Sequence, residues 1–252
     1  MTMCRSSGRY DSDMTTDIRN ELAPSGKLRV GLNYGNFLLV LKDSPDGSPT
    51  GIAPDLGREL GKRLGVPVEF VKFQQAGQLA DGVRDGKCEV GFLGAEPQRA
   101  NEIAFTRAYL EIPVTFLVPA GSKIKNIADV DRDGVRIAVS ARSAYDLYLS
   151  RTLKHAKLER VEGIDASYDL FLKNRLEALG GLKPRLTADA DKLPGSRVLD
   201  GQVTGVQQAC GTTKNRVAGA RYLHEFIEDV KRSGLVKKTI DKHGVRGVTV
   251  AP

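Results

Sequence analysis

Short strand-like runs that alternate with helical patterns are the feature of this sequence that most constrains its fold. Residues 28–33 and 66–73 are rich in β-forming residues, and the segment between them places Leu56, Leu60 and Leu64 at a spacing of four. Helices of this length between strands predict βαβ units around a parallel sheet, so the expected fold class is α/β.

A second unit repeats this rhythm further along the chain. Residues 111–121 are expected to form a strand that leaves the first unit, and new strands are expected over 135–139 and 158–161, each followed by a helix. Residues 196–210 are expected to be extended, and a long amphipathic helix is expected over 215–234. Two α/β lobes joined by extended strands place a cleft between them, which is a common position for a ligand.

Composition excludes several classes of protein. No stretch of the 252 residues approaches the roughly 20 apolar residues of a membrane-spanning helix. The three cysteines lie far apart without a CxxC motif and the three histidines follow no metal-ligand pattern, so we expect neither a disulfide framework, a metal site nor a cofactor. The net charge is +7, but the basic residues are spread along the chain, and nucleic acid is not the expected partner.

The first residues are polar and are interpreted separately. Residues 1–25 are expected to be a flexible N-terminal extension, and Met14, which opens a more regular helical segment, is expected to be the true start. No apolar segment typical of a secretory signal is present, so either a signal has been removed or the protein is cytosolic.

The most informative segment is CEVGFLGAEPQRANEIAFTRAY, residues 88–109. A buried strand ends at Gly94, and a polar turn places Arg99 just past its carboxyl end, where ligands bind in open α/β sheets. A guanidinium can hold a carboxylate with two hydrogen bonds, so Arg99 is a candidate ligand residue. The alternative is a surface residue that pairs with Glu96 or Glu102.

This segment occurs together with LRVGLNYGNF, GIAPDLGRELGKRLGVPVEFV and GVRIAVSARSAYDLYL, in an order that resembles the family 3 extracellular solute-binding proteins. These are receptors of polar amino-acid ABC importers. The resemblance implies a two-lobed, type II periplasmic-binding-protein fold that closes like a Venus flytrap, with a mostly parallel sheet flanked by helices in each lobe and two hinge strands. It implies that residues 26–116 and 206–252 form lobe 1 and residues 117–205 form lobe 2. It also implies a periplasmic location and an ABC permease as partner, contacted at the membrane.

The resemblance also assigns ligand residues. Arg99 stands at the family's carboxylate-binding arginine. Ser143 and Ala144 stand at the helix start where the family holds the ligand carboxylate, and a capping box between Ser143 and Asp146 is compatible with that role. Arg142 stands where the family usually has a small residue, so it either adds a second positive contact or narrows the cleft.

Two further loops are weighed in the same way. Asn36 falls where the family has an aromatic ring; it is expected to bond a ligand oxygen and Phe37 to supply an apolar wall, or else Asn36 is a turn residue and Phe37 belongs to the core. The amides of Gln207 and Gln208 reach the cleft or fix the hinge, and the hinge is the preferred role.

Three positions depart from the family and bear on the ligand. Gly94 and Ala95 replace the usual serine or threonine, and Leu182 occupies the position of an aspartate that pairs with the α-ammonium of an amino acid. A buried ammonium without a charge partner costs on the order of several kcal/mol. The expected ligand is therefore a carboxylate without an α-amino group, such as a keto, hydroxy or aromatic acid. Glu177 or Glu96 is an alternative partner for the ammonium group, and with such a partner the ligand is an amino acid.

The preferred function is thus a receptor for a small carboxylate, without catalytic turnover. One alternative is an enzyme that resembles cyclohexadienyl dehydratases, with Glu96, Glu177 or Lys173 as general acid. The other is a cytosolic ligand-sensing module.

Overall fold

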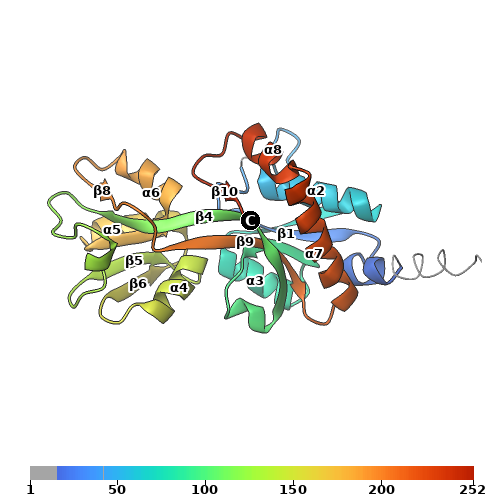
Figure 1. Cartoon of the computed structure of the whole chain (residues 1–252), viewed down its shortest axis with the longest axis horizontal. Coiled ribbons are helices and arrows are strands. Elements are labelled where there is room, and N and C mark those ends of the chain that lie inside the picture. The colour runs from blue at the N-terminus through green and yellow to red at the C-terminus, as the bar shows by residue number, and fades with distance from the viewer. Residues whose placement is uncertain (1–15, 42) are drawn as a thin grey trace, which may run out of the picture.

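The computed structural model describes residues 16–41 and 43–252, and two α/β lobes lie side by side in it, linked by two long strands (Figure 1). The strands are β1 (Leu28–Asn33), β2 (Val68–Phe73), β3 (Val90–Gly94), β4 (Ile103–Val118), β5 (Arg136–Ser140), β6 (Lys157–Val161), β7 (Ala178–Leu182), β8 (Arg197–Val198), β9 (Thr204–Thr213) and β10 (Thr249–Val250). They form one ten-stranded sheet in the order β2-β1-β3-β9-β4-β7-β5-β6, while β8 and β10 pair with β4 outside this path.

Helices flank the sheet in both lobes (Figure 1). The α-helices are α2 (Ile52–Leu64), α3 (Ala76–Arg84), α4 (Ala144–Thr152), α5 (Ile164–Lys173), α6 (Lys183–Ala190), α7 (Val217–Arg232) and α8 (Leu235–Lys242). Two short 3-10 helices, η1 (Arg99–Asn101) and η2 (Ile127–Asp129), lie in the loops.

Each lobe is built on a group of three parallel strands. In lobe 1, β1 pairs in parallel with β2 and β3, and in lobe 2, β5 pairs in parallel with β6 and β7. The apolar side chains of β1 are fully buried because helices cover the sheet, and the leucine stripe of α2 faces that core. Gly65 ends α2 in the left-handed conformation, with φ of 67°, which a glycine adopts without strain.

The strands β4 and β9 connect the lobes. They pair antiparallel from Ile103 and Thr213 in lobe 1 to Val114 and Thr204 beside lobe 2. The expected lobe boundaries at residues 116 and 206 fall inside these two strands. The expected α/β fold, with two lobes and two hinge strands, is confirmed.

The N-terminal segment differs from the expected flexible extension. Residues 16–22 are helical, Leu22 is fully buried in the main hydrophobic core, and Glu21 Oε2 accepts a hydrogen bond of 2.7 Å from the N–H of Gly219. The described part of this segment is therefore packed against lobe 1. The expected start at Met14 lies outside the described residues.

The fold also bears on membrane-spanning helices, metal sites and disulfides. Among residues 16–41 and 43–252, no helix combines the length and the apolar character that a membrane crossing needs. In the same part of the chain, no three His, Cys, Asp or Glu side chains are grouped to hold a metal ion. Cys88 and Cys210 are buried free thiols.

Candidate functional site

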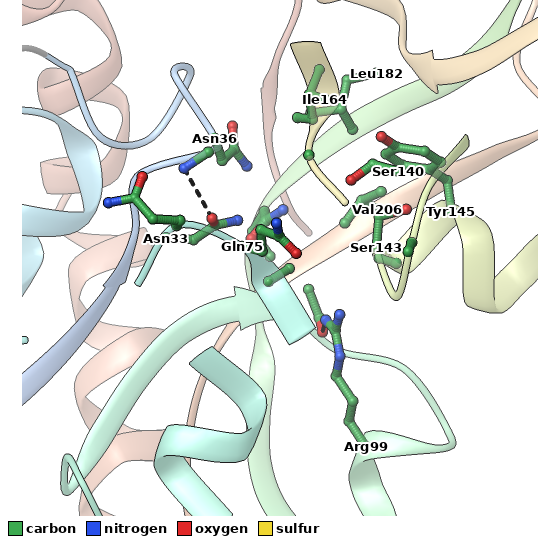
Figure 2. A pocket seen from close by; sticks show the side chains of 18 residues that line it. Asn33, Asn36, Gln75, Arg99, Ser140, Ser143, Tyr145, Ile164, Leu182 and Val206 are labelled. Carbon is green, nitrogen blue, oxygen red and sulfur yellow. Dashed lines mark hydrogen bonds between the residues drawn. The ribbon is translucent and has the colours of Figure 1, made fainter. Parts of the chain in front are cut away.

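A cavity that is partly open to solvent lies between the lobes, with about 530 Å³ of empty space in and at the mouth of it (Figure 2). The residues that follow the carboxyl ends of β1, β2 and β3 form its lobe 1 wall, and the residues at the carboxyl ends of β5, β6 and β7 form its lobe 2 wall. Parallel strands of one lobe end at the same edge of the sheet, which is where ligands bind in open α/β folds. The site is therefore a consequence of the topology of both lobes.

Arg99 is buried at the floor of this cavity, with 7% of the residue exposed. Its Nη1 donates a hydrogen bond of 2.7 Å to the carbonyl of Gly94 in lobe 1, and its Nη2 donates one of 2.7 Å to the carbonyl of Arg142 in lobe 2. Each of these nitrogens carries a second N–H that is free for a ligand carboxylate. The alternative of a surface residue is wrong because Arg99 is buried, and Glu96 pairs with Arg151 instead.

Burial lowers the pKa of Arg99 to about 10, and the charge of Glu96 partly opposes that effect. The guanidinium stays protonated at neutral pH. A buried cation that makes hydrogen bonds only to neutral carbonyls gains from an anionic ligand, because the anion replaces part of the lost hydration. Figure 2 shows the side chain rising toward the first turn of α4.

The start of α4 supplies the second group of donors. Ser143 is its N-cap and accepts a hydrogen bond of 3.1 Å from the N–H of Asp146. The reciprocal half of the expected capping box is shifted by one residue, since Asp146 accepts from the N–H of Arg142 at 2.8 Å. The first turn presents the N–H groups of Ala144 and Tyr145, which have no acceptor within the helix. Together they form a positive end of the helix beside Arg99.

Arg142 does not line this cavity, so the expected second positive contact is wrong. Its backbone has a left-handed φ of 57°, which turns the side chain away. The guanidinium instead bonds both carboxylate oxygens of Asp81 on α3, at 2.9 and 2.8 Å.

Ala95 and Phe37 also lie outside the lining. The N–H of Ala95 donates to the carbonyl of Gln207 at 2.8 Å, so Ala95 has a structural role. Phe37 is 38% exposed and its ring centre lies 6.0 Å from the guanidinium carbon of Arg185, so it is neither a cavity wall nor a core residue.

Asn36 is a turn residue, as one alternative predicted, and it also lines the cavity. It lines the cavity with 5% of the residue exposed, and its Oδ1 accepts a hydrogen bond of 3.2 Å from the N–H of Leu38. This Asx turn uses the carbonyl oxygen, so the Nδ2 group is the end available for a ligand acceptor.

Apolar side chains also line part of the cavity. Leu182 at the end of β7 is 4% exposed and lines the cavity together with Ile164 and Val206 (Figure 2). Gly94 faces part of this lining, because an added Cβ would lie 2.9 Å from Cγ1 of Val206 and 3.0 Å from Cβ of Ala144. A glycine at this position lets the lobes approach closely.

The sequence missed several lining residues that carry polar groups. Gln208 lines the cavity, whereas Gln207 Nε2 bonds Glu111 Oε2 at 2.8 Å across the hinge strands. The preference for a hinge role was right for Gln207 and wrong for Gln208. Alternation along a strand, which sends neighbouring side chains to opposite faces, is the signal that separates them. The other missed groups are the polar side chains of Asn33, Gln74, Gln75, Ser140 and Tyr145.

The cavity lining carries one formal charge. Within the described residues, Arg99 is its single charged side chain, and no aspartate, glutamate or lysine belongs to it. Glu177, a candidate partner for an ammonium, is held by Arg136 with Nη2 at 2.9 Å from Oε1, and Glu96 is held by Arg151. The carboxylates proposed as substitutes are thus engaged elsewhere.

Comparisons with known proteins agree with this architecture. Residues 28–246 match the model of the bacterial extracellular solute-binding proteins, family 3. A solute receptor for L-cysteine of Neisseria gonorrhoeae is similar with a TM-score of 0.76 at 21% identity, over 92% of this chain and 95% of that one. A mutant of the arginine-binding protein ArgBP from T. maritima gives 0.73 at 21% identity, over 90% and 98%.

The ancestral amino acid-binding protein AncCDT-1, a precursor of cyclohexadienyl dehydratase, is similar with a TM-score of 0.71 at 24% identity, over 88% of this chain and 97% of that one. Likenesses at these identities establish the two-lobed fold. The family match spans most of the chain, from β1 to the segment after α8. This chain therefore belongs to the bacterial extracellular solute-binding proteins of family 3.

Proposed function

We propose that the protein is the substrate-binding component of an ABC importer and captures a small carboxylate in the cavity between its lobes. The observation that carries the proposal is the Arg99 guanidinium, which bonds one carbonyl of each lobe and keeps N–H groups for an anion. The first turn of α4 supplies further donors. We place the protein in the periplasm beside its permease, and antibody detection in periplasmic and cytosolic fractions separates this from a cytosolic ligand-sensing module.

The lining favours a carboxylate that has no α-ammonium group. Leu182, Ile164 and Val206 offer an apolar surface, and the lining of the described chain holds no carboxylate side chain. An ammonium enclosed there loses its hydration without gaining a charge partner, at a cost on the order of several kcal/mol. A 2-oxo, 2-hydroxy or aromatic acid carries no such penalty, and the amide of Asn36 can donate to its uncharged oxygen.

Titration calorimetry with matched pairs of acids tests this proposal. Suitable pairs are pyruvate and alanine, 2-oxoisovalerate and valine, and phenylpyruvate and phenylalanine. We expect an oxo acid to bind more tightly than its amino counterpart. Tight binding of an amino acid with no binding of its oxo analogue would contradict the ligand class.

The variant Leu182→Asp tests the same idea from the protein side. A carboxylate at this position gives an ammonium its charge partner, so we expect the preference to move toward the amino acid of each pair. The matched control is Leu172→Asp on α5, which adds the same charge at an exposed leucine outside the lining. An equal shift in both variants would show that the effect is one of net charge.

The dehydratase alternative needs a general acid at the cavity. Its candidates, Glu96, Glu177 and Lys173, are not among the lining residues. Prephenate and arogenate turnover, followed by absorbance, is the direct measurement, and we expect no product.

A further inference from the structure

We infer that Asp81 of lobe 1 and Arg142 of lobe 2 form an interlobe clamp that positions Arg99 when the lobes close. The clamp is the ion pair in which Nη1 and Nη2 of Arg142 bond the two oxygens of Asp81 at 2.9 and 2.8 Å. It joins α3 to the loop that precedes α4. The inference rests on the proposed function in one respect, namely that Arg99 holds the ligand.

Arg142 is bonded in three directions at once. Its N–H donates to Asp146 Oδ2 at 2.8 Å, its guanidinium bonds Asp81, and its carbonyl accepts Nη2 of Arg99 at 2.7 Å. The left-handed backbone, with φ of 57°, is unfavourable for a residue other than glycine. Such a conformation persists where surrounding bonds determine it, and here those bonds come from both lobes.

The lobe 1 side of the clamp is prepared for this contact. Asp81 also accepts a hydrogen bond of 3.0 Å from Arg84 on its own helix, which fixes the carboxylate independently of lobe 2. Its pKa is lowered mainly by the hydrogen bond from Arg142, so the carboxylate is ionised at neutral pH. Gly77 leaves room for the arginine, since an added Cβ would lie 2.9 Å from Cβ of Arg142.

Opening the lobes breaks two contacts together. Separation of α3 from the α4 loop removes Arg142 from Asp81, and the carbonyl of Arg142 then leaves Arg99. Closure therefore restores the second anchor of the Arg99 guanidinium in the same step that forms the ion pair. A second interlobe pair, between Arg151 and Glu96 at 2.8 Å, acts in the same direction.

The test measures lobe closure directly in the full chain. Spin labels are attached at Leu172→Cys in lobe 2 and Val217→Cys in lobe 1, which are both exposed positions. Cys4 is replaced by serine in every variant. Pulsed electron–electron double resonance then measures the distance between the two labels. We expect Asp81→Asn to lower the ratio of closed to open molecules about twofold to fivefold, the range for a partly exposed ion pair. High salt is expected to lower the ratio more in the parent than in the variant, which keeps the Arg151–Glu96 pair between the lobes but not the clamp.

The control is Asp229→Asn. Asp229 also bonds two arginines, Arg63 and Arg232, but all three lie in lobe 1, so the distance distribution should remain that of the parent. The charge-reversed pair, Asp81→Arg with Arg142→Asp, is expected to restore closure, and unfolding temperatures verify that every variant folds. Unchanged distances in Asp81→Asn would overturn the clamp. These distances are measured without a ligand. The result for the clamp therefore stands whether or not the protein binds a carboxylate.

Discussion

The Arg99 guanidinium determines the chemistry of the cavity. It is a buried cation whose hydrogen bonds go to two neutral carbonyls, and burial lowers its pKa from the usual arginine value to about 10. The unfolded chain binds this proton more tightly than the folded protein does. The contribution of Arg99 to stability is therefore unfavourable and constant at neutral pH, and it improves as the pH rises above about 10 toward the pKa of an arginine in the unfolded chain.

The affinity for a ligand should also depend on the protonation of Arg99, but it should fall with rising pH where the stability rises. We expect the affinity for a carboxylate to stay constant from neutral pH to about pH 9 and to fall above about pH 10, where Arg99 loses its charge. Calorimetric titrations across this range measure the effect. Arg99→Gln serves as the control, with weak binding at every pH. A pH-dependent loss of equal size in that variant would show that other groups cause it.

Single residues also show what sequence can and cannot predict. Arg99 and Ser143 were predicted from their places in the turns after two strands and from the family resemblance, and Leu182 was predicted from the resemblance alone. All three line the cavity. Arg142 and Phe37 were misplaced. The left-handed backbone of Arg142 is maintained by hydrogen bonds to Asp146 and Asp81. Asp81 lies 61 residues before Arg142, so the residues next to Arg142 in the sequence do not indicate this contact.

At the scale of elements, the strand β3 ends at Gly94, which lies against Val206 of β9 and Ala144 of α4. Gly94→Ala is expected to hinder closure, because its Cβ would approach Val206 and Ala144 to about 3 Å. Overpacking costs about 1–3 kcal/mol, so we expect the closed fraction and the carboxylate affinity to fall about fivefold or more.

The interlobe spin labels and calorimetry measure both effects of Gly94→Ala. Ala95→Ser, one residue further and outside the lining, is the control and should behave as the parent does. Closure equal to that of the parent in Gly94→Ala would show that the lobes have more room here than the contacts indicate.

The sequence predicted the alternation of strands and helices well, but not every element. The helix α6 was missed because Leu186 is its main buried apolar residue, so no apolar stripe marks it. The strand β4 begins at Ile103, earlier than the expected residue 111. Its pairing with β9 shifts register between Phe105 and Leu110, which interrupts the regular alternation that reveals a strand.

At the scale of the whole molecule, the main hydrophobic cluster extends through both lobes, beside two smaller clusters. The main cluster of buried side chains includes Val30 in lobe 1, Ile137 in lobe 2, and Val114 and Phe116 of β4 between them. We therefore expect the protein to unfold in a single cooperative transition, with equal calorimetric and van't Hoff enthalpies in scanning calorimetry. Two separate transitions would show that the lobes are independent units.

The pairing of β4 with β9 also has a stereochemical consequence. Two hydrogen-bonded strands hold the lobes in a fixed order, so we expect closure to bring the same atoms of the two walls together each time. If the proposed ligand class is right, Arg99, Asn36 and Leu182 contact the acid at three separate points of the cavity. Three points of contact distinguish mirror images, so we expect a chiral hydroxy acid to bind as one enantiomer in preference to the other.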